Sequence, residues 1–350
     1  LTWVPHGTMK NANRPVSKEK IKSPLEWLLA HELIVPTGES TVVMPREISL
    51  VLRDGKLLSH LEVSASSPIS GSVDPLRVNQ TAAHNALDFV QLVETLLEEW
   101  SLEPPSQLRG GGLGVRDFVA ACEIIKKSEH ETAVVIEVAY AAGLISPDEN
   151  SGWLPTTQYD AWLNNEDAKR WEKLAQAWIA MSRAPHIIGG ESTDRINALS
   201  ASVERGFIQP LRSTVLSILS NDIIGATAQA VDITAHLDWL RPRRSSQVRG
   251  RAVTAILQEA ELVGITGAGA LSNFGRALTA GEDGHTSLAE FLPAPVDYII
   301  VQADLTALAP GRLPAAQRRT LNVIADVESM GVATTYRFSE SSVRRALDHG

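Results

Sequence analysis

Three segments of the chain share one pattern, and this repetition constrains the fold more than any other feature of the sequence. Each segment begins with a helix-like run and passes through a step of four residues, which reads HELI at 31–34, AGLI at 142–145 and AELV at 260–263. A turn containing glycine, serine or aspartate follows, then a short apolar piece and a small amphipathic tail. This order predicts a helix, a two-stranded hairpin and an amphipathic exit segment in each of the three segments.

Such an ending is typical of winged-helix modules, in which the third helix leads into a strand, a wing turn and a second strand. We therefore expect an α+β, mostly helical protein with tandem winged-helix domains followed by a small β-α-β-α domain. The predicted divisions are a partial winged-helix-like module at 1–63, a linker and long helix at 64–107, an acidic winged-helix module at 108–165, a helical connector at 166–230, a basic winged-helix module at 231–285 and the last domain at 290–350.

The composition is that of an ordinary globular protein with several domains. The chain has 350 residues, of which 44% are hydrophobic and 21% charged, and two to four domains are expected at this length. A single cysteine, Cys122, provides no internal disulfide and fits a reducing compartment. The longest apolar run, Ala133 to Ile145, is too short to span a bilayer. We expect a cytoplasmic, nucleoid-associated protein without a membrane partner.

Charge is unevenly distributed along the chain. The net charge of −9 argues against a surface that binds nucleic acid all over. Residues 241–276 nevertheless hold six arginines against two acidic residues, a local balance of +4. Residues 85–150 hold twelve acidic residues against four basic ones, a balance of −8. The first region could meet phosphates, whereas the second would repel them.

The basic region predicts a recognition helix. At helical spacing, one face would be buried and would carry Val248, Ala252, Ile256, Ala260 and Val263. The opposite face combines arginine and glutamine, which pair with guanine and adenine, and the arginines just before the helix suit phosphate contacts. The candidate DNA-binding residues are Arg241, Arg243, Arg244, Gln247, Arg249, Arg251, Thr254 and Gln258. Alternatively, these arginines solvate the exposed start of a helix or pair with an acidic neighbouring module.

The acidic module has the opposite character. Its third helix is expected to bury Val134, Val138 and Ala142. Its outward positions offer no fixed positive charge, and a DNA phosphate would meet Glu129, Glu131 and Glu137. We therefore interpret this module as a packing or protein-binding unit, with these three glutamates as candidate protein-interaction residues.

The last segment changes from helical to β-rich patterning. Residues 298–308 and 333–338 predict strands, residues 315–329 predict a helix, and Ser339 is placed to cap a final helix. A sheet with so few strands needs further partners, so we expect the β-α-β-α domain to be truncated.

Motifs in this last segment resemble the N-terminal domain of helicases of the xeroderma pigmentosum B type. The matching positions are Val301, Gln302, Asp304 and Thr306, then Tyr336, Arg337, Phe338 and Ser339, then Ser342, Ala346 and Gly350. GGGLGVRDF at 110–118 and WLPT at 153–156 look like actinobacterial helicase-associated proteins that carry this domain after winged helices. The resemblance implies an accessory role at DNA, in repair or transcription.

Nothing in the sequence predicts catalysis. No G-x-x-x-x-G-K-[ST] phosphate loop occurs, and the glycine cluster at 110–114 follows no predicted strand, so we interpret it as a linker or tight turn. The histidines lack metal-ligand spacing. We expect no catalytic residues, metal or cofactor, and a non-enzymatic helicase-associated protein that binds duplex or forked DNA. The alternative is a protein-interaction scaffold that docks a separate helicase, nuclease or polymerase.

Overall fold

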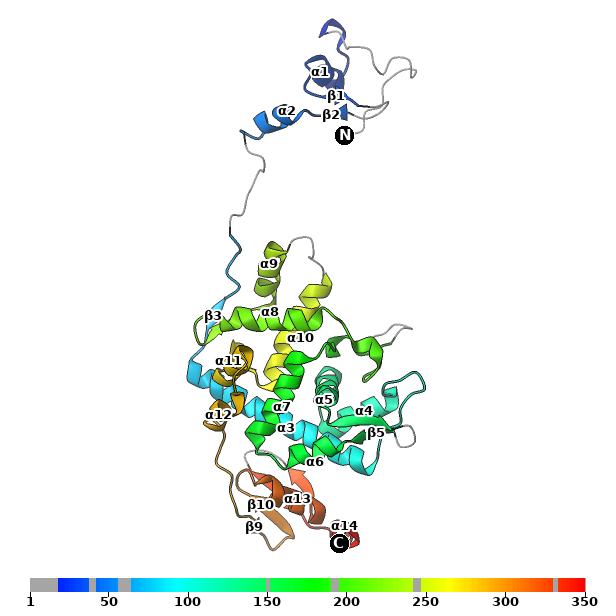
Figure 1. The fold of residues 1–350 in the computed structure, drawn as a ribbon, viewed down its shortest axis with the longest axis vertical. Coiled ribbons are helices and arrows are strands. Elements are labelled where there is room, and N and C mark those ends of the chain that lie inside the picture. The colour runs from blue at the N-terminus through cyan, green and yellow to red at the C-terminus, as the bar shows by residue number, and fades with distance from the viewer. Residues whose placement is uncertain are drawn as a thin grey trace. The chain divides into compact units, whose positions relative to one another are not determined.

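The computed structural model describes residues 18–37, 42–55, 64–148, 152–189, 195–241, 247–329 and 333–349. It divides the chain into two compact units, residues 1–65 and residues 66–350 (Figure 1). The architecture is α+β and mostly helical, with small antiparallel sheets, which confirms the predicted fold class. Among the described residues, no helix combines the length and the apolar character that a membrane span requires.

The first unit contains one copy of the repeated pattern. Its elements are α1 (Pro24–Ala30), the hairpin of β1 (Val35–Pro36) and β2 (Val42–Val43), and α2 (Arg46–Val51). The Ser23 hydroxyl accepts a hydrogen bond from the Glu26 amide at 3.2 Å, and Pro24 occupies the first helical turn. Both residues favour a helix start, because one satisfies a free amide and the other needs no amide partner.

The second unit is built around α3 (Pro75–Leu102), a helix of 28 residues. The Asp74 carboxylate caps its first turn by accepting from the Arg77 amide, and Pro75 follows in the first position. The helix runs through the centre of the unit, where it contacts helices and strands of both the second and the third copy of the pattern (Figure 1). Such a helix must be apolar on more than one face, and Ala86, Phe89, Val90 and Val93 are all fully buried.

On one side of α3 lies the second copy of the pattern. It comprises α4 (Val115–Ile125), α5 (Glu129–Ala141), the hairpin of β4 (Ile145–Asp148) and β5 (Gly152–Pro155), α6 (Thr157–Leu163) and α7 (Asp167–Ala180). Ser128 and Glu131 form a reciprocal capping box at the start of α5. The tryptophans of α7, Trp171 and Trp178, are fully buried in the common core.

The third copy contains one more strand than the second. It comprises α8 (Ile208–Ser220), β6 (Ala226–Thr227), α9 (Ala230–Leu240), α10 (Gln247–Val263), β7 (Thr266–Gly267), β8 (Ala270–Leu271), α11 (Asn273–Ala280) and α12 (Gly284–Ala289). Its antiparallel sheet has the order β3-β6-β8-β7, in which β3 is Gly71–Ser72. The interpretation of residues 64–75 as a linker throughout is therefore wrong, because this segment supplies an edge strand.

All three copies end their helix in the same way. Glu32, Gly143 and Gly264 follow the helices with positive φ angles of 60°, 72° and 81°. The next amide then donates to the carbonyl five residues earlier, from Leu33 to Leu28, from Leu144 to Ala139 and from Ile265 to Ala260. The equivalent step in the third copy is therefore 263–266, three residues later than the AELV predicted from the sequence, which is still helical.

The last segment forms a small domain with two hairpins. Its elements are β9 (Ile300–Val301), β10 (Thr306–Ala309), α13 (Ala315–Ile324), β11 (Asp326–Ser329), β12 (Thr334–Arg337) and α14 (Glu340–His349), with sheet order β11-β12-β10-β9. The predicted single strand at 298–308 is wrong, because the Asp304 carboxylate accepts from the amide and hydroxyl of Thr306 and turns the chain. Residues 326–329 are a strand rather than helix, so the predicted β-α-β-α order becomes β-β-α-β-β-α.

A cluster of buried charges joins this small domain to α3 and α7. The Glu94 carboxylate of α3 accepts from Arg170 at 2.9 Å and also from Arg318 of α13. Asp167 of α7 pairs with both Arg170 and Arg312. Glu94 and Arg170 are the fully buried members, so the loss of either would remove the main compensation of a buried charge, and the junction depends on this pair.

The packing of α3 against the turn after α10 is testable with a pair of glycine substitutions. A Cβ on Gly264 would lie 2.4 Å from the Ala86 amide nitrogen, whereas a Cβ on Gly269 would meet nothing closer than 3.8 Å. Both glycines have φ near +80°, so both alanine variants carry similar backbone strain. We expect Gly264→Ala to lower the unfolding free energy by about 1–3 kcal/mol more than Gly269→Ala in urea denaturation. Equal reductions in the two variants would contradict the close approach.

Candidate nucleic-acid interface

Helix α10 has a buried side and an exposed side. Ala252, Ile256, Ala260 and Val263 are buried, as predicted, but the prediction is wrong for Val248, whose side chain is 58% exposed. The opposite positions, Gln247, Arg251, Thr254 and Gln258, are all exposed, so the predicted outward stripe is confirmed as a surface. Polar side chains capable of contacting bases or phosphates thus run along four successive turns of one helix.

Both acidic residues of α10 accept hydrogen bonds from other groups of the protein. Glu259 is buried, where it accepts a hydrogen bond from Trp178 Nε1 at 2.8 Å and faces Arg212 at 3.7 Å. The Glu261 carboxylate accepts from the Thr266 hydroxyl and from the amides of Ala268 and Gly269. The exposed stripe of α10 therefore carries the positive charge of Arg251 and no acidic residue.

The hairpin after α10 has a tip of two residues, Ala268 and Gly269, both with positive φ. The Glu261 carboxylate satisfies the amides of this tip, as described above. A short, tied turn of this kind keeps a fixed shape because both backbone conformation and hydrogen bonds are determined.

The arginines of the basic region have different roles. Arg249 forms an ion pair with Asp238 of α9, and Arg276 donates to the carbonyls of Leu219, Ser220 and Ile223 at the end of α8. Both arginines were counted in the local balance of +4, but their partners within the protein leave neither of them free to contact DNA. Arg241 and Arg251 are exposed, while Arg243 and Arg244, with Ser245 and Ser246, lie outside the described residues.

An exposed aromatic residue lies two positions before Arg241 and was not among the predicted site residues. Trp239 lies in the last turn of α9, 38% exposed, two residues before Arg241. The signal for it was the run DWLRPRR at 238–244, in which an aromatic residue precedes clustered arginines. Aromatic side chains beside basic ones are suited to stacking on unpaired bases.

Helix α5, the counterpart of α10 in the second copy, cannot serve as a recognition helix. Residues 132–139 are all buried, so no face of its central turns reaches solvent. Glu137 was predicted to face outward, and this is wrong: its carboxylate is fully buried, where it accepts from Arg183 and from the Leu199 amide. Burial raises the pKa of Glu137, although Arg183 and Leu199 oppose the shift. Glu131 is used in the capping box, and Glu129 remains exposed.

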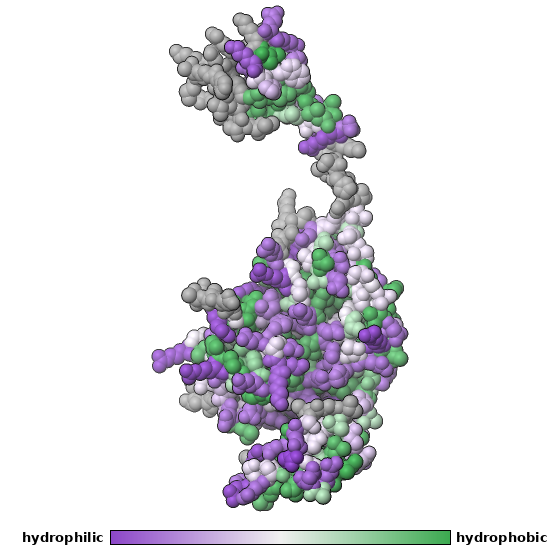
Figure 2. Space-filling model, turned by 180° about the vertical axis from the view of Figure 1, so that it is seen from behind, coloured by the Kyte–Doolittle hydropathy of each residue, from purple (hydrophilic) through white to green (hydrophobic). Residues whose placement is uncertain are grey.

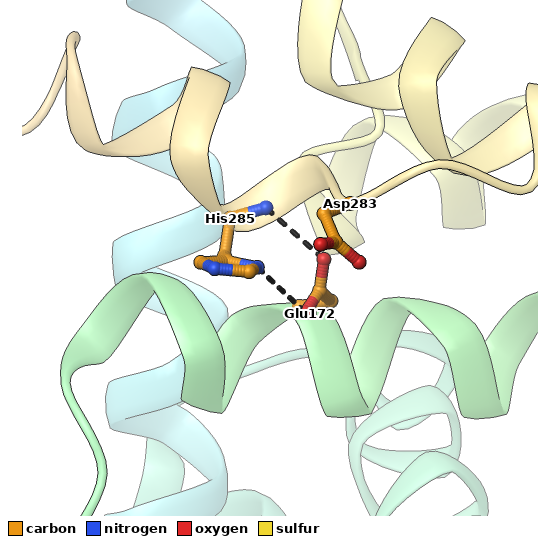
Figure 3. Close-up of side chains that lie close together, drawn as sticks. All are labelled: Glu172, Asp283 and His285. Carbon is orange, nitrogen blue, oxygen red and sulfur yellow. Dashed lines mark hydrogen bonds and ion pairs between the residues drawn. The ribbon is translucent and has the colours of Figure 1, made fainter.

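One cluster in the described part of the chain brings together three side chains of metal-binding type, Glu172, Asp283 and His285 (Figure 3). The Glu172 carboxylate accepts from the amides of Gly284 at 2.7 Å and His285 at 3.1 Å, and it contacts His285 Nδ1 at 2.9 Å. Glu172 of α7 thus caps the start of α12, and both of its oxygens have partners within the protein.

Comparison with known protein families gives a match in the small last domain. Residues 299–350 match the family model described as helicase conserved C-terminal domain. No curated protein matches the chain as a whole or in part. The match supports a helicase-associated protein, in agreement with the association inferred from the motifs. It names a C-terminal helicase domain, whereas the sequence resemblance was to an N-terminal one.

The motifs that carry the resemblance form a turn, an ion pair and a helix cap in this domain. Gln302, Asp304 and Thr306 form the turn between β9 and β10. Arg337 of β12 pairs with Glu328 on the neighbouring strand β11. The Ser339 hydroxyl caps α14 by accepting from the Ser342 amide at 3.1 Å. The predicted cap at Ser339 is confirmed.

The buried acid beneath the exposed stripe of α10 gives a pH-dependent prediction. Burial raises the pKa of Glu259 to about 7, against the opposing effects of Arg212 and Trp178. The folded protein therefore binds a proton more tightly than the unfolded chain, so the stabilisation present below the unfolded pKa disappears as pH rises through about 7. We expect the unfolding free energy of the native protein, relative to Glu259→Gln, to fall by about 3 kcal/mol from pH 4.5 to 8. Parallel pH profiles of the two proteins in urea denaturation would contradict this assignment.

Proposed function

We propose that the chain is a non-enzymatic, helicase-associated DNA-binding protein whose third module contacts duplex or forked DNA. The observation that carries the proposal is the exposed side of α10, which presents Gln247, Arg251, Thr254 and Gln258. The two acidic residues of this helix accept hydrogen bonds from other groups of the protein. Such a surface favours polyanions, because the exposed stripe of α10 carries an arginine and none of its own residues is acidic.

The arrangement of the third module supports this role. A helix, a strand, two helices and a hairpin follow one another, and the strand joins the hairpin in the order β6-β8-β7. This order is typical of a winged helix, in which the helix before the hairpin enters the major groove and the preceding turn contacts phosphates. Arg241, at the end of α9, occupies that turn.

The helicase-related domain supports a setting at DNA. It matches residues 299–350, and the motifs in this segment resemble helicases of the xeroderma pigmentosum B type, which implies repair or transcription. The sequence contains no phosphate-binding loop, so we propose an accessory to a separate motor rather than a motor itself.

The proposal is tested by fluorescence anisotropy with a labelled duplex and a forked DNA. We expect Arg241→Ala combined with Arg251→Ala to weaken binding by about tenfold or more, because two cations no longer neutralise phosphates. The salt dependence of binding should also decrease, by about one counterion for each phosphate that an arginine neutralises in the native complex. The fork is expected to bind more tightly than the duplex, because Trp239 offers a stacking surface for an unpaired base.

Arg116→Ala is the matched control, because Arg116 is exposed on α4 and its removal changes the net charge in the same way per residue. It should leave DNA affinity within about twofold of the native value. Equal binding by the double variant and the native protein would refute the assignment of α10.

A protein-interaction scaffold is the second candidate, and the acidic surface around the second module favours it. Glu137 and Glu94 are buried, but six acidic residues among those that the structure describes in 85–150 are exposed, namely Asp88, Glu99, Glu103, Glu123, Glu129 and Asp148. Hydrophilic residues also dominate much of the face of this unit shown in Figure 2. Failure of any DNA to bind at low salt would make this candidate, with a basic helicase or nuclease as partner, the leading one.

A further inference from the structure

The second unit contains an open cavity of about 530 Å³ beside the glycine-rich loop at 110–114. The loop was interpreted from the sequence as a linker or tight turn, and it is a turn: the Leu108 and Gly112 backbones are hydrogen-bonded at 3.1 Å. The opposite wall is the segment that follows the second module, from Arg195 to Arg205. A cavity of this volume lies within the range that holds small molecules.

The lining of the cavity combines apolar surface with polar groups and two positive charges. It includes Gly110, Gly111, Arg195, Asn197, Ser200 and Arg205, and none of the described lining residues is acidic. The Ser200 hydroxyl is buried and has no hydrogen-bond partner within the described part of the chain. A buried hydroxyl without a partner is costly, so a ligand that accepts its hydrogen bond would relieve the cost.

Buried interactions fix the shape of this cavity. The Glu137 carboxylate accepts from the Leu199 amide at 2.7 Å, and Arg183 donates to the Ser200 carbonyl at 2.8 Å. The Leu113 amide donates to the Ala198 carbonyl, also at 2.7 Å. A Cβ on Gly112 would lie 2.9 Å from that same carbonyl, so only glycine permits the loop to approach so closely. The two walls are therefore held in register before any ligand arrives.

The two arginines of the cavity differ in how firmly hydrogen bonds fix their side chains. Arg205 Nη1 donates to the carbonyls of Ser202 and Glu204, both at 2.7 Å, which fixes the position of its guanidinium. The neighbouring acid, Glu204, faces Arg183 at 3.5 Å. Arg195 is exposed, and no acidic residue of the described chain pairs with it.

We propose that this cavity binds a phosphate-type oxyanion, with the guanidinium groups of Arg195 and Arg205 and the Ser200 hydroxyl as donors. Arginine suits such a ligand because its planar fork donates two parallel hydrogen bonds to one anion. The anion is either a free phosphate or a phosphodiester of a nucleic-acid backbone, which share this chemistry. The site is separate from α10 and goes beyond the DNA contact proposed above.

The test is a ¹H–¹⁵N NMR titration of the full chain with inorganic phosphate, against chloride at matched ionic strength. The protein carries Arg241→Ala and Arg251→Ala, so that the surface of α10 does not contribute. We expect saturable shifts of the Gly110 and Gly111 amides. Arg195→Ala should raise the dissociation constant about tenfold or more, since it removes a charge-assisted hydrogen bond to the anion.

Gly110→Asp is a second variant that places a carboxylate in the cavity without disturbing the fold. A Cβ at this position meets nothing within 4 Å. It should abolish the phosphate-dependent shifts while the thermal unfolding midpoint is retained. Arg109→Ala is the matched control, because Arg109 is exposed in the same loop but does not line the cavity, and it should change the constant by less than about threefold.

A second titration with octathymidylate, whose internal anionic groups are phosphodiesters, distinguishes the two sources. Saturation by both probes assigns the site to a nucleic-acid backbone, and saturation by phosphate alone assigns it to a small free anion. Absence of saturable shifts with either probe, or an equal decrease of affinity in Arg109→Ala and Arg195→Ala, would overturn the proposal.

Discussion

The packing of helix α3 against the turn that follows α10 determines how the third module is presented. The backbones of Gly264 and Gly267 lie directly against α3, where a side chain on either glycine would approach backbone atoms to 2.4 Å and 2.3 Å. On α3, the Asn79 side-chain oxygen accepts from the Asn273 amide, and the Asn85 side-chain amide donates to the Glu261 carbonyl. Because the end of α10 is fixed in this way, its buried side is fixed too, and the side with Arg251 and Gln258 must face solvent.

Buried charges decide which charged residues remain for a partner. Three glutamates form ion pairs with arginines in the core, namely Glu94 with Arg170, Glu137 with Arg183 and Glu259 with Arg212. Two arginines have partners near the ends of helices: Arg249 pairs with Asp238 of α9, and Arg276 donates to carbonyls at the end of α8. Local charge balance therefore overstates the negative character of residues 85–150, because arginines from outside this segment compensate Glu94 and Glu137. In residues 241–276 two arginines and two glutamates have partners within the protein, so the balance of +4 is unchanged. The exposed positions on the two counterpart helices nevertheless differ in the predicted direction, since α10 exposes Arg251 and α5 begins with an exposed Glu129.

Local signals in the sequence were sufficient for most elements, and long-range contacts account for the rest. The three helix–hairpin–helix segments and the caps at Ser23 and Ser339 follow from spacing and from residues with local effects. The strand at Gly71–Ser72 could not be predicted, because its partner, β6, is far along the chain. The burial of Glu137 depends likewise on Arg183, and helical periodicity cannot show which face of a central helix a distant arginine covers. The site residues themselves were predicted in part: the outward stripe of α10 is exposed, whereas Arg249 is paired.

The measurement that tests the central claim most directly is site-specific photo-crosslinking to a labelled duplex. A photoreactive residue is placed at Gln247 or Thr254 on the exposed side of α10, and at Glu129 at the start of α5 as the control. The account predicts crosslinks to DNA from both positions of α10, weakened as salt is raised, and none from position 129. Crosslinks from position 129 alone, or binding of the duplex without crosslinks from α10, would contradict it.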